Sequence, residues 1–404
     1  MNQHSHFFSN KKNLLLILGI AVIAFNLRPA ITSVGPVIGS IRTDFGLSNG
    51  AAGLITTLPL LSFAILSPIA PRIGQKLGFE GAIVAGLCVL LLGIVLRATG
   101  FLSFLFIGTA LVGVGIAICN VLLPGLAKLH FPLKVGLITS VYSTLMSVFA
   151  ALASGITVPL AEGAGLGWNT TLFLWGGLVL LGLAVWVPQL RGKNSEPRPE
   201  EVQPLSSSLW KSAIAWQVTL FMGLQSFLFY SSVAWLPEIM QSHGMNIAAA
   251  GWMLSLMQFA GLPGNFLAPI IAGKMKDQRA IVIVISIFYT LGVCGLLIGG
   301  STTFLVISII LMGLASGSSI SLALTLIGLR SANAKQASKL SGMSQSLGYL
   351  LAASGPIVIG LVFDFFHTWT APLLLFIVIL AAMVITGLGA GRNQYAVREL
   401  EAGN

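Results

Sequence analysis

The sequence predicts an all-α membrane protein of twelve transmembrane helices, arranged as two successive sets of six. Three observations lead to this prediction: a very apolar composition, repeated apolar runs of membrane-spanning length, and short motifs that recur between the two halves. Of the 404 residues, 56% are hydrophobic and only 8% are charged, whereas a soluble domain usually carries about 25% charged residues. Because backbone groups in lipid must be satisfied within their own segment, each apolar run is expected to be a helix.

The apolar runs have close to the roughly 20 residues that a helix needs to cross about 30 Å of hydrocarbon. In chain order the predicted spans are 14–40, 50–71, 80–99, 101–125, 134–160, 168–188, 211–240, 246–273, 280–299, 301–327, 339–363 and 369–390. The first span follows Lys11 and Lys12, but it is longer than the core of a signal peptide and lacks an A-x-A-like cleavage site. We therefore expect the first span to be retained. Cys88, Cys119 and Cys294 fall within spans and are expected to be small core residues.

Basic residues are distributed unevenly between the two predicted sides of the membrane. Of the 21 Lys and Arg residues, only Arg42 and Arg97 fall in loops that this topology places outside, and Arg28 lies within a span. This positive-inside pattern predicts a bacterial-type cytoplasmic membrane protein with both termini in the cytoplasm. Topology thus accounts for the net charge of +10. As partners we expect the lipid bilayer and a small-molecule solute but no nucleic acid, and we expect a monomer.

A polar, proline-containing segment divides the chain. Residues 191–210 are predicted to be a flexible cytoplasmic linker between six-helix bundles at 1–190 and 211–404. Four short motifs recur in the same order in both bundles, offset by 200 or 201 positions. The pairs are Gly35-Pro36-Val37-Ile38 with Leu236-Pro237-Glu238-Ile239, Leu66-Ser67-Pro68-Ile69 with Leu267-Ala268-Pro269-Ile270, Leu111-Val112-Gly113 with Leu311-Met312-Gly313, and Ala153-Ser154-Gly155 with Ala353-Ser354-Gly355. Because six is even, the repeat is parallel, which is a transporter architecture. The alternative is an ordinary helix bundle with chance matches.

Two local motifs resemble a known family. The loop after the second span, Pro71-Arg72-Ile73-Gly74-Gln75-Lys76, resembles a loop motif of the major facilitator superfamily through Arg72, Gly74 and Lys76. Pro71 stands where that motif has an acidic residue, and Gln75 replaces one cation. Within the superfamily, Asn26-Leu27-Arg28-Pro29-Ala30 followed by Gly35-Pro36 resembles the cyanate and nitroimidazole transporter family. The resemblance implies the major facilitator fold and the transport, by alternating access, of a small anionic or heteroaromatic solute that is cyanate- or nitroimidazole-like.

Arg28 is the most informative residue, because a cation at bilayer depth costs roughly 2.5–3.5 kcal/mol even on the lenient insertion scale. Phe25, Arg28 and Thr32 share one face of a helix. Pro29 and Pro36 cannot donate to the carbonyls one turn earlier, and freed carbonyls are tolerated where they line a cavity. We interpret this face as a substrate-binding clamp for an anion, built on a guanidinium fork. The alternative is an arginine that is hydrogen-bonded to freed carbonyls and helix C-termini.

Polar and aromatic side chains in other spans are candidates for the same binding cavity. They are Asn120, Tyr142, Gln225, Trp235, Gln258, Asn265 and Gln345. Rings can stack on a flat solute, and amides can fix its orientation. The alternative for each one is a contact between neighbouring helices, worth about 0.6 kcal/mol per pair. Asn26 lies on another face of the first span and is expected to bond a neighbouring helix.

No His, Asp or Glu cluster, metal-ligand spacing or nucleophile–base pair lies at membrane depth, so we expect neither an enzyme nor a bound metal or other cofactor. All 11 Asp and Glu residues lie at span ends, in loops or in tails. Uniport, exchange and symport in which the solute carries the proton therefore remain open. The alternative functions are a multidrug or toxic-compound efflux transporter and, more remotely, a membrane sensor that transports nothing.

Overall fold

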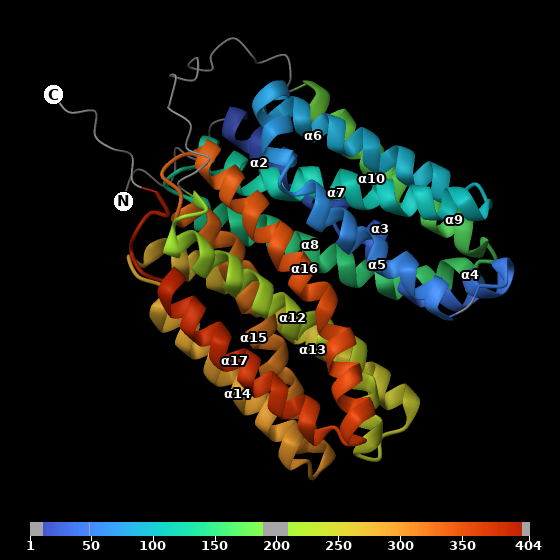
Figure 1. Cartoon of the computed structure of the whole chain (residues 1–404). Coiled ribbons are helices and arrows are strands. Elements are labelled where there is room, and N and C mark those ends of the chain that lie inside the picture. Colours follow the sequence, from blue (N-terminus) through green and yellow to red (C-terminus); the bar gives the residue numbers. More distant parts are fainter. Residues whose placement is uncertain (1–10, 48, 189–208, 398–404) are drawn as a thin grey trace. The chain divides into compact units, whose positions relative to one another are not determined.

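The computed structural model describes residues 11–47, 49–188 and 209–397 (Figure 1). Within these ranges all regular structure is helical. Eleven apolar helical stretches within these ranges are long enough to cross a membrane, with the interrupted stretch Leu14–Phe45 counted as one, and Thr57–Leu66 is a shorter apolar stretch. The predicted all-α membrane class is therefore confirmed, and the second predicted span corresponds to the shorter α5 (Asn49–Leu66). Most of the predicted linker at 191–210 lies outside the described residues.

The chain divides into two compact units. The first comprises residues 1–123 and 141–202, and the second comprises residues 124–140 and 203–404. These units differ from the two predicted bundles mainly in the segment 124–140, which groups with the second unit. That segment contains the end of α7 (Leu102–His130) and the start of α8 (Val135–Val158).

In the first unit, the first span is not one helix. It consists of α2 (Lys11–Asn26), α3 (Pro29–Thr32), the short η1 (Gly35–Val37) and α4 (Ile38–Phe45). The remaining elements, besides α5, α7 and α8, are α6 (Ala70–Arg97), η2 (Pro159–Gly163), α9 (Gly167–Leu174) and α10 (Gly176–Trp186). Figure 1 shows α6 and α10 lying side by side, in agreement with the contacts between them.

The second unit contains six long helices. They are α12 (Ala213–Ser242), α13 (Ile247–Lys274), α14 (Arg279–Ile298), α15 (Thr302–Leu329), α16 (Ala334–Phe366) and α17 (Thr370–Ala390). Four of them begin at a Ser or Asn whose side chain accepts a hydrogen bond from the first turn, namely Ser212, Asn246, Ser301 and Asn333. Such N-caps satisfy backbone donors that a helix start leaves free. α12 packs on α16, and α13 packs on α15.

The two units repeat one close helix crossing. A Cβ built on Gly113 in α7 would lie 2.7 Å from the Cα of Pro59 in α5. A Cβ built on Gly313 in α15 would lie 2.8 Å from the Cβ of Ala260 in α13. The glycines are offset by 200 positions and their partners by 201. Small residues let transmembrane helices approach closely, so the sequence repeat corresponds to a repeat in packing.

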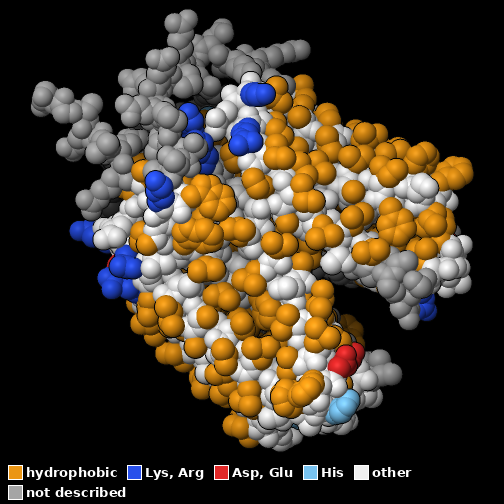
Figure 2. All heavy atoms as spheres, viewed as in Figure 1, with side chains coloured by type: hydrophobic (Ala, Val, Ile, Leu, Met, Phe, Trp, Pro, Cys, Tyr) orange, Lys and Arg blue, Asp and Glu red, His pale blue; other side chains and the backbone are white. Residues whose placement is uncertain are grey.

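Large apolar side chains lie on the outside of the helices. On α14, for example, Val284, Ile287, Phe288 and Leu291 are exposed at helical spacing. Figure 2 shows hydrophobic side chains over the long sides of the helices and most of the visible Lys and Arg side chains near helix ends. In water such wide apolar surfaces would mark an interface, and in a membrane protein they face lipid.

Candidate functional site

The first span is interrupted at Arg28. α2 ends at Asn26, and Arg28, with φ −123° and ψ −39°, is the N-cap of the four-residue α3. Pro29 follows as the first residue of α3, where its missing N–H costs nothing. The backbone carbonyl of Arg28 accepts hydrogen bonds from the N–H groups of Ile31 and Thr32, both at 3.0 Å. The arginine therefore lies at a break in the helix.

Helix α8 packs on the face that carries Phe25 and Thr32. The ring of Phe25 stacks on that of Phe149, with centroids 4.1 Å apart and planes inclined by 18°. The Thr32 hydroxyl lies 3.2 Å from the carbonyl oxygens of both Arg28 and Ala150, and its single proton is shared between them. Contacts with α8 thus hold the residues on either side of Arg28.

Other polar side chains also stabilise the interrupted span. The Ser154 hydroxyl of α8 donates to the Thr32 carbonyl at 3.2 Å. Pro36, one turn after Thr32, cannot donate to this carbonyl because proline has no backbone N–H. On another face, Asn26 Nδ2 donates to the Leu178 carbonyl of α10 at 3.1 Å. The expectation that Asn26 bonds a neighbouring helix is therefore confirmed.

The Arg28 side chain is only partly buried. Within the part of the chain that the structure describes, its guanidinium makes no hydrogen bond or ion pair with another residue. An arginine presents five N–H donors in a planar fork that matches carboxylate-like geometry. The guanidinium is therefore available to a solute of complementary charge or polarity.

Arg97 differs from its prediction as an external loop residue. It is the last residue of α6 and is 1% exposed. Its Nη1 donates to the carbonyl of Ala30, in the interrupted first span, at 2.7 Å. Sequence reasoning missed this role because a cation in the last turn of an apolar run is typical of the membrane interface. Only the packing of α6 against the first span reveals that the side chain points inward.

The remaining candidates are divided between the two units. Asn120 and Tyr142 are buried in the first unit, and Gln225, Asn265 and Gln345 are buried in the second, whereas Gln258 is exposed. Gln225 Nε2 donates to the Met222 carbonyl at 2.9 Å, and Gln345 Nε2 donates to the Ser341 hydroxyl at 2.8 Å. These bonds are local to one helix, so they do not distinguish a binding role from helix stabilisation.

Trp235 lies apart from Gln225 and packs between helices. Its Nε1 donates to the Pro356 carbonyl of α16 at 2.8 Å, and its ring lies 5.7 Å from that of Trp369. Trp369 in turn stacks on Phe363, with centroids 4.3 Å apart. The contacts of Trp235 therefore match the alternative reading, a bond between neighbouring helices.

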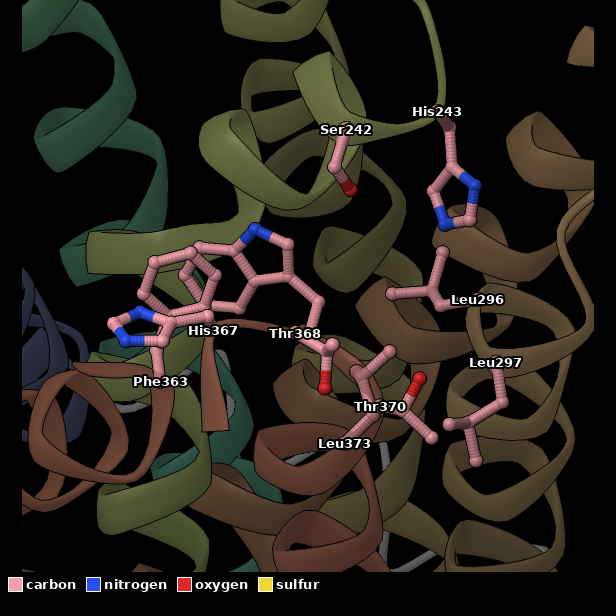
Figure 3. A pocket seen from close by; sticks show the side chains of 10 residues that line it. Ser242, His243, Leu296, Leu297, Phe363, His367, Thr368, Thr370 and Leu373 are labelled. Atoms are coloured by element: carbon pink, nitrogen blue, oxygen red, sulfur yellow. The ribbon is translucent and has the colours of Figure 1, made fainter. Parts of the chain in front are cut away.

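A cavity of about 320 Å³ lies next to this aromatic cluster in the second unit (Figure 3). Its lining residues are Ser242, His243, Leu296, Leu297, Phe363, His367, Thr368, Trp369, Thr370 and Leu373. Figure 3 shows His243 and His367 on opposite sides of it. None of the binding residues predicted from the sequence lines this cavity.

The predicted loop motif lies at the start of α6. Arg72 and Lys76 are exposed, and Gly74 is buried. A Cβ on Gly74 would lie 2.9 Å from Leu122 Cδ2 of α7, so a larger residue here would require the Leu122 side chain to move. Gly78, with φ 75° and ψ 162°, kinks the helix after the motif, a conformation that favours glycine.

The three cysteines are all free, but, contrary to the expectation, they are not all core residues. Cys119 is buried and Cys294 partly buried, whereas Cys88 is exposed. Cys88 therefore lies on the outward face of α6. Among the described residues, no group of three or more His, Cys, Asp or Glu side chains could hold a metal ion.

The sequence matches the family model of the Major Facilitator Superfamily over residues 14–353 and 235–392. The chain belongs to the major facilitator superfamily. It is therefore a multi-pass membrane transporter that handles small-molecule solutes, and not an enzyme. The solved structure of the proton:xylose symporter XylE, at 13% identity, has a TM-score of 0.76 and covers 95% of this chain and 97% of its own. That likeness shows the same fold.

Three similar proteins indicate where in the superfamily this chain belongs. An uncharacterized transporter of Bacillus subtilis, YycB, is 58% identical over 97% of both chains. The 2-nitroimidazole transporter of Escherichia coli is 40% identical over 96% of this chain and 98% of its own. The cyanate transport protein CynX of Escherichia coli is 26% identical over 84% of this chain and 88% of its own. The predicted resemblance to the cyanate and nitroimidazole family is confirmed.

Proposed function

We propose that this transporter moves a small anionic or heteroaromatic solute, cyanate- or nitroimidazole-like, across the cytoplasmic membrane by alternating access. Arg28 is the main binding residue in this proposal. Both termini lie in the cytoplasm, as the distribution of Lys and Arg favours. The names of the 40% and 26% identical relatives support this class of solute.

The observation that carries the proposal is the state of the Arg28 guanidinium. It lies in an apolar span, is partly exposed, and has no hydrogen bond or ion pair to another described residue. A permanent cation with no protein partner is costly at this depth, unless water or a solute contacts it. An anion, or a flat solute with electron-rich oxygen and nitrogen atoms, would accept its N–H donors.

The neighbours of Arg28 favour a flat solute. Phe25 is held by its stack on Phe149, and the Thr32 hydroxyl is held between the carbonyls of Arg28 and Ala150. A ring fixed in this way has little freedom to lose when a planar solute packs against it. The amides of the second unit, Gln225 and Gln345, are proposed as further binding residues.

The test is solute binding to the purified full-length transporter and to Arg28→Ala and Arg28→Lys. Calorimetry with 2-nitroimidazole and with cyanate gives the Kd of each protein. A charge-assisted hydrogen bond contributes about 1.5–3 kcal/mol, so Arg28→Ala should weaken binding about 10- to 100-fold. Arg28→Lys, which keeps the charge but not the fork, should fall in between.

Arg42→Ala is the matched control, because Arg42 is an exposed arginine at the outer part of the same span, in α4. It should bind the solute like wild type. Wild-type affinity in Arg28→Ala would refute the assignment of Arg28. If wild type binds neither compound, the proposed class of solute is wrong.

A further inference from the structure

The interruption of the first span deprives the Ala30 carbonyl of its helical donor. In a continuous helix that donor would be the N–H of Val34, but Val34 donates to the Ile31 carbonyl at 3.3 Å. Arg97 takes its place, because Nη1 donates to the Ala30 carbonyl at 2.7 Å. Ala30 is 1% exposed, so without Arg97 this carbonyl would be a buried acceptor that needs another donor.

Arg97 is itself fixed by a backbone contact between α6 and α7. A Cβ on Gly108 would lie 2.6 Å from the N atom of Arg97 and 2.6 Å from the carbonyl oxygen of Gly93. No side chain fits between helices that approach so closely. The Arg97 side chain therefore extends from a rigid helix crossing to the interrupted segment.

Packing alone does not explain an arginine at this position. Nε and Nη2 of Arg97 are buried and have no hydrogen-bond partner among the described residues. No described carboxylate forms an ion pair with it either. A buried cation with so few partners costs free energy, and leucine or methionine would fill similar space without that cost. The feature that leucine or methionine would lack is a strong donor aimed at the Ala30 carbonyl.

We propose that Arg97 is a positioning residue for the solute site. By clamping the carbonyl two residues after Arg28, it fixes the backbone from which the Arg28 guanidinium extends. Ser154 clamps the Thr32 carbonyl in the same way, so donors from α6 and α8 both hold the segment. Arg97 acts through Arg28 and does not touch the solute. This inference rests on the proposed function of Arg28.

The first test needs no solute. Arg28→Cys is introduced into a variant without the three native cysteines, and the rate of labelling by a small charged methanethiosulfonate reagent is measured. Adding Arg97→Met should raise that rate about tenfold, the lower end of what the loss of one charge-assisted hydrogen bond allows, because the segment can then open. Arg97→Lys, which keeps a charged donor, should restore most of the protection.

The matched control is Arg330→Met in the second unit. Arg330 is 2% exposed, and its Nε donates to the Ala390 carbonyl at 2.8 Å. Like Arg97, it is therefore a buried arginine that donates a hydrogen bond to a backbone carbonyl. Its loss should leave the labelling rate at position 28 unchanged. An unchanged or slower rate in Arg97→Met overturns the inference. If Arg97→Met does not fold, Arg97→Gln is judged by the same criteria.

The second test is a double-mutant cycle on the Kd for 2-nitroimidazole. Arg97→Met should weaken binding about tenfold, and adding it to Arg28→Ala should cause no further loss, because both act through one guanidinium. Additive losses would overturn the positioning role. Wild-type affinity in Arg28→Ala would instead refute the proposed function, while the labelling result would still report on the clamp.

Discussion

The first helices of the two units follow one sequence pattern but differ in structure. In the first unit this span is divided into α2, α3, η1 and α4, whereas its counterpart α12 runs unbroken from Ala213 to Ser242. At the repeat offset of 201, Pro36 matches Pro237. At the same offset Arg28 matches Phe229, so only the first unit has a cation here.

The difference teaches that proline alone does not interrupt a span. Pro237 lies inside the continuous α12, and Pro356 lies inside the continuous α16. What the first span has in addition is a set of donors for its freed carbonyls, from Ser154 and Arg97. A break is stable where neighbouring helices supply such partners. The first unit thus combines the interruption with the partly exposed cation.

The shared plan of the units can be tested by filling the repeated helix crossing. Gly113→Val and Gly313→Val each place atoms on a neighbouring backbone or side chain, and overpacking of this kind costs about 1–3 kcal/mol or more. Both variants should lower the apparent melting temperature strongly and by similar amounts. Gly177→Val, at a glycine with open space around it, is the control and should change little. Sensitivity at only one of the two crossings would contradict a packing repeat.

A smaller effect tests the difference between the units. Ser154 and Ser354 are offset by 200 positions, but Ser154 bonds the interrupted span at the Thr32 carbonyl, whereas Ser354 donates to Leu351 of its own helix at 2.7 Å. Losing the Ser154 bond should cost about 1 kcal/mol, or about fivefold in solute Kd. Ser154→Ala should therefore weaken binding, and Ser354→Ala should not. Equal effects on Kd would show that the interruption has no special role in binding.

Much of the fold could be predicted from the sequence, because span length, charge asymmetry and the repeat are local or additive signals. The importance of Arg28 also follows from one residue in an apolar run. The roles of Arg97 and Ser154 could not be predicted, because they depend on which carbonyls of a distant span are left free. Trp235 fits a binding pattern by residue type, yet its bond to Pro356 depends on the packing of α12 on α16.

The smallest predicted effect concerns a carboxyl at the start of α14. Asp277 accepts hydrogen bonds from Arg279 Nε at 2.7 Å and from the Arg279 N–H at 2.8 Å. The side-chain bond from Arg279 holds the pKa of Asp277 below its ordinary value of 3.8.

A carboxyl with a lowered pKa in the folded state adds stability above its unfolded pKa and loses it as the pH falls through the folded value. Because the pair is largely exposed, the effect should be small. Asp277→Asn should therefore lower the apparent melting temperature slightly at neutral pH and should converge with wild type once the pH falls below the lowered pKa of Asp277. Glu238→Gln, at another exposed carboxyl of the second unit, is the control. A difference between Asp277→Asn and wild type that persists unchanged at low pH would contradict a role for the charge.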